Sequence, residues 1–466
     1  MKPVKILCPT GHLSFTPLEQ GSFLLGCEQK PDFIIADAGS CDMGPRPLGA
    51  DQHVSLEAWQ RQDLEIMLLQ ARKLGVPMIV GSASDTGTDR GVDQFVGLIR
   101  DIAEQHRLAP FKLAAIYAEQ SIDELKRKVA GGARIEGLDG RPDADLATLN
   151  RTTRVVAVMN AEPIRAALSA GADVVIAGRS SDCALFAAPL LNAGFGPGIA
   201  YYTGKLMECA SFCCEPYMGK ESILGRVEGD TVYVAAMHPG QRCTPASLGS
   251  HAMYERTNPY REDVAGGYVD MTNCRYEQVD PKTTRASGQA FVPTPTCKVK
   301  LEGAGIVGER RLAVVGIRDP NTIALIDKAI DWAKGKIVER FGPIGLDAAG
   351  RYDVFYHLYG RSAVMKELDP SPELKPHELG IVVEAVHRDG TKAAEIAALA
   401  ARNLFYARLP ETKGTAGAAA LMSDEILVGE AAYEWTLNHV IEVKNAMELF
   451  RTRSFTINGA GLKEAV

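Results

Sequence analysis

Two stretches of the sequence place glycine, hydroxyl and carboxylate residues in the same order, each directly after a short apolar run. Residues 77–88 read PMIVGSASDTGT, and residues 173–182 read DVVIAGRSSD. A segment with helical periodicity follows each loop, so free N–H groups and the helix dipole favour an anion there. The candidate substrate-binding residues are Gly81, Ser82, Ser84, Gly178, Arg179, Ser180 and Ser181. Ordinary helix N-caps use the same residue types and are the structural alternative.

Short buried strands that alternate with helices must position these loops. Apolar runs predict strands at 4–8, 33–36, 78–80, 113–116, 155–159 and 174–177. Helical periodicity predicts helices at 58–74, 92–104, 121–130, 162–170 and 183–191. This alternation is typical of an α/β domain with a mostly parallel sheet and flanking helices. Ligands bind such sheets at the carboxyl ends of the strands, where the two loops lie.

Ionisable side chains follow several of the predicted strands at this same edge. His12, Asp85 and Asp182 are candidate catalytic residues, because a cluster of such groups can transfer protons. Asp37 and Asp42, together with Asp85, are candidate ligands for a divalent metal. Each acid taken alone also fits a cap or a turn.

Further reactive residue types lie later in the chain. Glu208 is a fourth candidate catalytic residue, with a buried, hydrogen-bonded acid as its alternative. Cys209, Cys213 and Cys214 lie on a predicted helix, either as iron–sulfur ligands or as small buried side chains. Arg242 lies in the segment HPGQRCTP, which fits a lid over the sheet edge or a surface turn. We count Arg242 among the candidate substrate-binding residues.

The pattern of predicted helices, strands and turns changes twice along the chain, which predicts three domains. Residues 1–222 form the α/β domain with the paired loops. Residues 223–320 are rich in turn residues and half-polar strands, which predicts a β-rich, loop-heavy extension lying over the sheet. Residues 321–466 are predicted to form an α+β domain. Its expected strands are 352–359, 378–387 and 433–443, and its expected helices are 322–340 and 391–408.

The composition is that of a globular protein and narrows the function classes. Hydrophobic residues make up 46% of the 466 residues, and the net charge is −7 without a basic stripe, which disfavours nucleic acid as a partner. No apolar run reaches the roughly 18 residues of a membrane span. Ten cysteines without paired spacing and an N-terminus without a signal-peptide pattern predict a cytoplasmic protein. Walker A and dinucleotide-binding patterns are absent, so no nucleotide cofactor is expected.

Three segments carry a resemblance to a known family. They are 171–185 (GADVVIAGRSSDCAL), 204–209 (GKLMEC) and 435–451, which contains WTLNHV and MELFR. These segments resemble the acyclic terpene utilisation family of AtuA-like proteins, and the resemblance spans most of the chain. It implies a role in bacterial catabolism of branched acyl-CoA compounds.

We therefore hypothesise a cytoplasmic, homo-oligomeric lyase of the hydratase or dehydratase type. Its substrate would be a small carboxylic acid or the CoA thioester of one, with Arg179 and the loop N–H groups holding the carboxylate. Two alternatives remain open. One is a non-catalytic subunit that binds an acyl-CoA-like anion and assembles with a small partner subunit. The other is a metal-dependent hydrolase that uses His12 and the three candidate metal ligands.

Overall fold

The chain folds into two compact units. A computed structural model describes residues 2–347, 351–407, 409–411, 419–421, 426–458 and 461–464. The first unit comprises Met1–Gly305 and Trp435–Val466, and the second comprises Ile306–Glu434. These units differ from the three expected domains (1–222, 223–320 and 321–466), because strands from the expected extension and from the end of the chain join the first sheet.

Five parallel strands form the centre of the main sheet in the first unit. In their order across the sheet they are β1 (Val4–Cys8), β2 (Phe33–Gly39), β3 (Met78–Asp85), β7 (Val174–Ala177) and β4 (Phe111–Tyr117). Every neighbouring pair is parallel. The apolar runs that predicted these strands are buried between two layers of helices. The predicted α/β fold class is confirmed.

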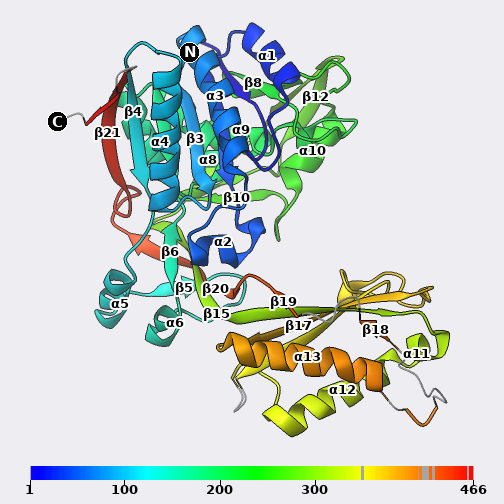
Figure 1. Cartoon of the computed structure of the whole chain (residues 1–466). Coiled ribbons are helices and arrows are strands. Elements are labelled where there is room, and N and C mark those ends of the chain that lie inside the picture. The colour runs from blue at the N-terminus through cyan, green and yellow to red at the C-terminus, as the bar shows by residue number, and fades with distance from the viewer. Residues whose placement is uncertain are drawn as a thin grey trace. The chain divides into compact units, whose positions relative to one another are not determined.

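Antiparallel strands extend this sheet at both edges. Beyond β1 lie β8 (Ile223–Glu228), β9 (Thr231–Ala236), β13 (Thr283–Ser287) and β12 (Arg275–Asp280). Beyond β4 lie β21 (Arg451–Asn458) and β22 (Gly461–Glu464), so the red C-terminal segment of Figure 1 runs beside β4. Part of the expected extension therefore continues the sheet instead of lying over it, because β8 pairs with β1 along five residues.

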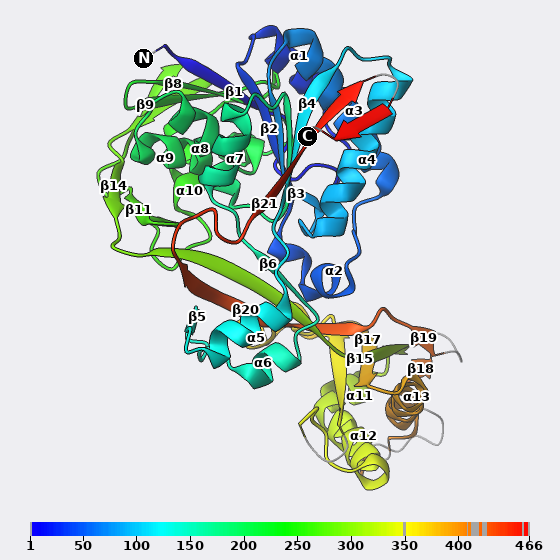
Figure 2. The same cartoon turned by 90° about the vertical axis from the view of Figure 1, so that its left-hand side faces the viewer.

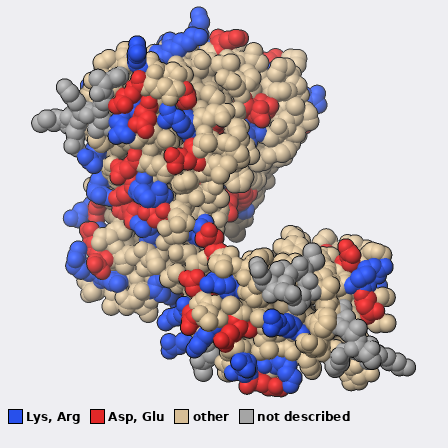
Figure 3. Space-filling model, in the orientation of Figure 1, with Lys and Arg blue, Asp and Glu red and all other residues tan. Residues whose placement is uncertain are grey.

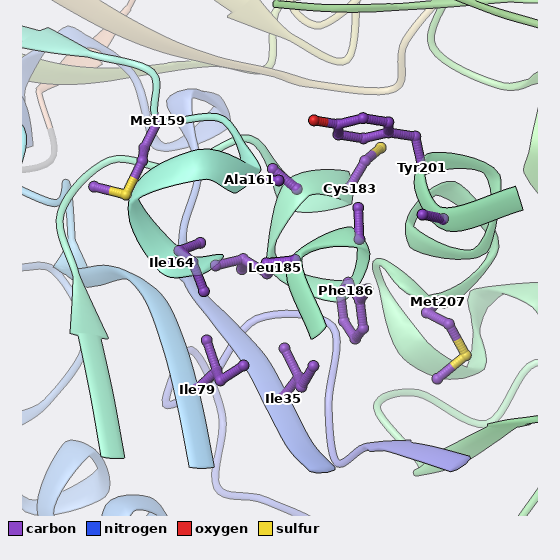
Figure 4. Close-up of a cluster of buried hydrophobic side chains, with 14 of the residues drawn as sticks. Ile35, Ile79, Met159, Ala161, Ile164, Cys183, Leu185, Phe186, Tyr201 and Met207 are labelled. Atoms are coloured by element: carbon purple, nitrogen blue, oxygen red, sulfur yellow. The ribbon is translucent and has the colours of Figure 1, made fainter. Parts of the chain in front are cut away.

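Helices cover both faces of the main sheet and enclose two hydrophobic cores (Figure 2). On one face pack α7 (Ala161–Ser169), α8 (Asp182–Asn192) and α9 (Pro197–Met207). Figure 4 shows Ile35 and Ile79 of the strands facing Leu185 and Phe186 of α8 in this core. On the other face pack α1 (Gln20–Glu28), α3 (Glu57–Leu74) and α4 (Asp89–Gln105). The helices predicted at 58–74, 92–104, 162–170 and 183–191 are confirmed, with ends that differ by up to three residues.

A smaller sheet in the first unit uses a strand that the sequence suggested for the main sheet. β6 (Arg154–Ala157) pairs with the early part of β15 (Cys297–Ile317), and β5 (Ile135–Gly137) pairs with β20 (Ala432–Val443). The strand predicted at 155–159 therefore forms outside the parallel sheet, because its partner comes from far downstream. The remaining elements of this unit are α2 (Pro45–Ala50), α5 (Ile122–Ala130), α6 (Leu146–Asn150), α10 (Pro245–Met253), β10 (Arg261–Val264), β11 (Gly267–Asp270) and β14 (Ala290–Pro293).

The second unit is an α+β fold. The part of β15 from Ile306 onward pairs antiparallel with β17 (Leu379–His387), which pairs with β16 (Tyr352–Tyr359). α12 (Ile326–Phe341) and α13 (Gly390–Tyr406) pack on this sheet through an apolar core. Shorter elements are α11 (Pro320–Ala324), β18 (Ala420–Leu421) and β19 (Leu427–Val428). The helix predicted at 322–340 is thus two helices, and most of the strand predicted at 433–443 belongs to the first unit.

Charged side chains of both signs are interspersed on the surface. Figure 3 shows Lys and Arg next to Asp and Glu on the face in view, without a stripe of one sign. Pairs such as Arg226 with Glu228 are exposed and stabilise the fold little. Within the described ranges, no helix combines the length and the apolar character needed to cross a lipid bilayer.

The crossing of α8 and α9 depends on Gly204. A Cβ atom there would lie 2.1 Å from the carbonyl oxygen of Cys183. We therefore expect Gly204→Ala to lower the free energy of unfolding by about 1–3 kcal/mol, measured by urea unfolding. Gly97→Ala is the matched control, because a Cβ on this α4 glycine meets nothing within 4 Å and alanine favours a helix. Equal stability of the two variants would contradict the packing argument.

Candidate functional site

The two echoing loops lie side by side, because β3 and β7 are neighbouring parallel strands. The Ser82 N–H donates to the Gly178 carbonyl oxygen over 3.1 Å, and the Arg179 N–H donates to the Gly87 carbonyl oxygen over 3.0 Å. A side chain on Gly178 would not fit, since its Cβ would lie 2.8 Å from the Gly87 oxygen. The expectation that both loops meet at the carboxyl edge is confirmed.

The protein itself supplies a carboxylate partner for Arg179. Its Nε donates to Oε2 of Glu302 over 2.8 Å, and its Nη1 donates to Ser82 Oγ over 3.2 Å and to the Ser180 carbonyl oxygen over 3.0 Å. Glu302, on β15, also accepts from Lys300 over 2.9 Å. Burial opposes the charge of Glu302, but Arg179 and Lys300 outweigh burial and lower its pKa to about 2. The guanidinium expected to hold a substrate carboxylate is thus engaged internally.

Most of the other predicted substrate-binding residues are buried parts of the loops themselves. These are Gly81, Ser82, Ser84, Gly178 and Ser180. Ser84, for example, has a positive φ of 57° and donates to Gln94 Oε1 over 3.1 Å. Ser181 differs, because it directly precedes α8 and lines the cavity described below. Arg242 lies at a separate depression, where its 62% exposed side chain pairs with Glu215 at 3.0 Å.

His12 and Asp85 meet at the sheet edge and hold a loop. Asp85 Oδ2 accepts from the N–H groups of Val54 over 2.6 Å and Ser55 over 2.8 Å, and His12 Nε2 lies 3.4 Å from Oδ1. Burial alone would raise the pKa of Asp85, but hydrogen bonds from His12, Ser55 and Val54 lower it. Asp85 is therefore an ionised carboxylate whose oxygens are already used as acceptors. Neither His12 nor Asp85 lines the cavity that contains the other two candidate catalytic residues.

The three aspartates predicted as metal ligands do not converge. Burial and the nearby Asp182 raise the pKa of Asp37 well above its usual value. Asp42 is exposed in a short 3-10 turn, Cys41–Met43, and Asp85 is engaged as described above. Each acid has its own local surroundings, so the expected carboxylate cluster does not form. Within the described ranges, the His, Cys, Asp and Glu side chains close enough to share one ion are Cys213, Cys214 and Cys243.

A cavity of about 940 Å³ brings together two of the four candidate catalytic residues. Asp182 and Cys183 at the start of α8 line it, as does Glu208, which directly follows α9. Other charged lining residues include Arg179, Lys205, Arg256, Glu262, Lys300 and Glu302. The cavity therefore combines acids and cations, and its position beside the start of α8 agrees with the predicted strand-end location.

Glu208 is a buried acid held by a cation and a thiol. It is 8% exposed, forms an ion pair with Lys205 and accepts from the Cys183 thiol over 3.2 Å. Burial raises the pKa of Glu208 to about 7, although Lys205 opposes this shift. Asp182 and Glu262 add to the increase, because a further negative charge is unfavourable near them. A carboxyl group that titrates near neutral pH can both accept and release a proton.

The groups around Glu208 hold it without competing for its proton. His251 Nε2 donates to the Glu208 backbone carbonyl oxygen over 3.0 Å, and burial lowers the pKa of His251 to about 3, so the imidazole is neutral. Burial and the charge of Glu208 raise the pKa of the Cys183 thiol well above its usual value. The Lys205 ammonium lies 4.4 Å from the centre of the Tyr254 ring. These contacts leave Glu208 as the group that titrates near pH 7 in this cluster.

Several residues that complete this site were not predicted from the sequence. Lys205 precedes Glu208 by three residues at the end of a helix, and this spacing is a signal that could have identified the pair. Arg256 pairs with Glu262, six residues further along the chain, and Glu302 pairs with Arg179 across a separation of 123 residues. No local pattern connects these residues to the strand-end loops.

Comparison with known proteins gives a match over most of the chain. The sequence model of the family described as "Acyclic terpene utilisation family protein AtuA" matches residues 4–434. This match confirms the resemblance drawn from the sequence. No curated protein and no solved structure matches the chain.

The buried ion pair gives a prediction about stability. Glu302→Gln leaves the Arg179 guanidinium without its closest counter-charge, so we expect the free energy of unfolding at pH 7 to fall by about 3 kcal/mol. This loss is at the lower end of the range for breaking a buried ion pair, because Asp182, 3.5 Å from the guanidinium, still provides a negative charge. Urea unfolding measures the change. Glu228→Gln, in the exposed pair with Arg226, is the control and should cost less than about 1 kcal/mol.

The Arg179–Glu302 pair also predicts how the stability difference between wild type and Glu302→Gln depends on pH. The pKa of Glu302 is lowered from 4.5 to about 2 in the folded protein. Its ionised form therefore stabilises the wild type fully above the unfolded pKa, and this stabilisation is lost as pH falls through the folded pKa. The gap between wild type and Glu302→Gln should shrink from pH 7 to pH 3. A constant gap would show that the pair does not contribute through its charge.

Proposed function

Because the chain belongs to the acyclic terpene utilisation family AtuA, we propose that it is a lyase of the hydratase or dehydratase type. Its proposed substrate is a small carboxylic acid or the CoA thioester of one. The observation that carries the proposal is Glu208, a buried carboxyl group with a pKa of about 7 at a cavity of about 940 Å³. Addition or removal of water next to an acyl group requires such a proton acceptor and donor.

In the proposed hydration, water adds across a carbon–carbon double bond conjugated to the acyl carbonyl. Glu208, as a carboxylate, accepts a proton from water while the water oxygen bonds to the β-carbon. The α-carbon receives a proton from the Lys205 ammonium. The direct ion pair then returns the proton from Glu208 to Lys205, so the protein is restored and the substrate has gained one water. Dehydration is the reverse sequence.

Exposed cations of the cavity wall take the anion-binding role expected for Arg179. The side chains of Lys300, Lys298 and Arg261 line the cavity and are 36%, 41% and 42% exposed. They are therefore accessible to a carboxylate or to the phosphates of CoA. Asp182, whose side chain is 37% exposed, is the proposed acceptor that orients the water or hydroxyl group.

The described residues argue against one of the two other hypotheses, and the assay below tests the second. The metal-dependent hydrolase required a carboxylate cluster that the described residues do not form. The non-catalytic anion-binding subunit would use the same cavity without turnover, and it is the contrasting outcome of the assay below. The homo-oligomer and the small partner subunit remain predictions.

Turnover in labelled water tests the proposal. We would incubate the protein in H2(18)O with branched 3-hydroxy acids, α,β-unsaturated acids and their CoA thioesters, and measure label uptake by mass spectrometry. We expect wild type to label one of these classes and Glu208→Gln to be slower by at least about 100-fold while it stays folded at the assay temperature. Glu228→Gln, a surface control, should keep the full rate. Binding of a thioester without label uptake would instead support the non-catalytic subunit.

The rate should also follow the ionisation of Glu208. With a pKa of about 7, the carboxylate fraction rises from about 0.1 at pH 6 to about 0.9 at pH 8, so kcat/KM for hydration should rise by about tenfold over that interval. Dehydration starts from the same ion pair and hydration changes no net proton count, so kcat/KM for dehydration should show the same slope. Glu208→Asp should retain the slope at a lower rate. A flat profile through neutral pH would assign proton transfer to another group.

A further inference from the structure

Three thiols from two separate segments meet inside the first unit. Cys213 and Cys214 lie at the end of the short 3-10 turn, Ala210–Cys213, that follows Glu208, and Cys243 lies just before α10. The three sulfur atoms lie within 4.8 Å of one another. The three residues are 0%, 4% and 0% exposed, and the proposed hydration does not use them.

We propose that Cys213, Cys214 and Cys243 bind one soft, closed-shell metal cation, Zn²⁺ or Cu⁺. Thiolate is the ligand that selects these ions. Sulfur atoms about 2.3 Å from one shared ion are separated by about 3.8 Å in a tetrahedral arrangement and about 4.0 Å in a trigonal one. The sulfur atoms of Cys213 and Cys214 are 3.9 Å apart. The thiols release their protons to solvent as the metal–sulfur bonds form.

The geometry distinguishes this site from the iron–sulfur cluster that Cys209, Cys213 and Cys214 could have bound. That cluster would have used Cys209, which is not helical: it has a positive φ of 58°, and its sulfur lies 3.0 Å from the Tyr254 hydroxyl. Three cysteines of an iron–sulfur cluster also bind at least two different iron atoms, which spreads the three sulfurs more widely than one shared ion does. In the proposed site the third ligand is Cys243, which is distant from Cys213 and Cys214 in the sequence.

A bound ion would join the backbone that carries Glu208 to the backbone that supports it. Cys243 leads into α10, whose His251 donates to the Glu208 carbonyl oxygen over 3.0 Å. Ser247 of α10 donates to the Cys213 carbonyl oxygen over 2.8 Å, so the two segments are in contact without a metal ion. The metal would act as a positioning element for Glu208. This consequence rests on the proposed function, whereas metal binding itself does not.

Metal analysis of the full chain tests the site. Protein kept under reductant and treated with a chelator is loaded in separate arms with Zn²⁺ and with Cu⁺, and bound metal is measured by mass spectrometry. We expect one ion per chain in at least one arm, which also identifies the ion. Cys243→Ser should bind at least tenfold more weakly. Cys297→Ser, a free cysteine outside the cluster, is the matched control and should bind as wild type does.

A spectroscopic measurement on the wild type keeps the test independent of variant folding. Co²⁺ at this site should give the strong near-ultraviolet absorption of cobalt–thiolate bonds, and addition of Zn²⁺ should remove it. No stoichiometric ion in either arm, no cobalt–thiolate band in protein that binds Zn²⁺, or equal weakening by Cys297→Ser would each overturn the proposal. These readouts need no substrate, so failure of the metal site and failure of the hydratase assay are distinguishable.

Discussion

The contact between Arg179 and Glu302 joins the carboxyl edge of the parallel sheet to β15, and the arrangement of the cavity depends on it. Dehydrating a guanidinium and a carboxylate is costly, and only their mutual contact with added hydrogen bonds offsets that cost. The bonds from Nη1 to Ser82 and Ser180 add to those that Glu302 accepts. Because Lys300 lies on the same strand as Glu302, the pair also fixes the wall that presents this cation to the cavity.

Two buried glutamates of the same cavity show how surroundings divide their roles. Glu302 faces Arg179 and Lys300, and these cations outweigh burial, so its pKa falls to about 2 and it stays ionised. Glu208 pairs with Lys205 and lies near other acids, so burial prevails and its pKa rises to about 7. The balance of neighbouring charges thus makes one carboxyl group structural and leaves the other able to exchange protons at neutral pH.

Local patterns predicted the features that depend on local forces. Apolar runs located β1 to β4 and β7, and the strand-end loops followed from the rule for parallel sheets. Glu208 was identified as a candidate, although its cation Lys205 was overlooked despite its helical spacing. Non-local pairing could not be predicted from the sequence. The partner of β6, the return of β21 to β4, the contact of Glu302 with Arg179 and the approach of Cys243 to Cys213 all join distant segments, and no single-sequence pattern encodes them.

The second unit interrupts the first in sequence, since the chain leaves the first unit after Gly305 and returns to it at Trp435. A ribosome therefore releases the whole second unit before β21, the strand that covers the outer edge of β4. Until β21 emerges, that edge offers unpaired backbone groups to any other chain. The second unit can complete its fold while the first still waits for its last strand, so the unit that begins synthesis first is completed last.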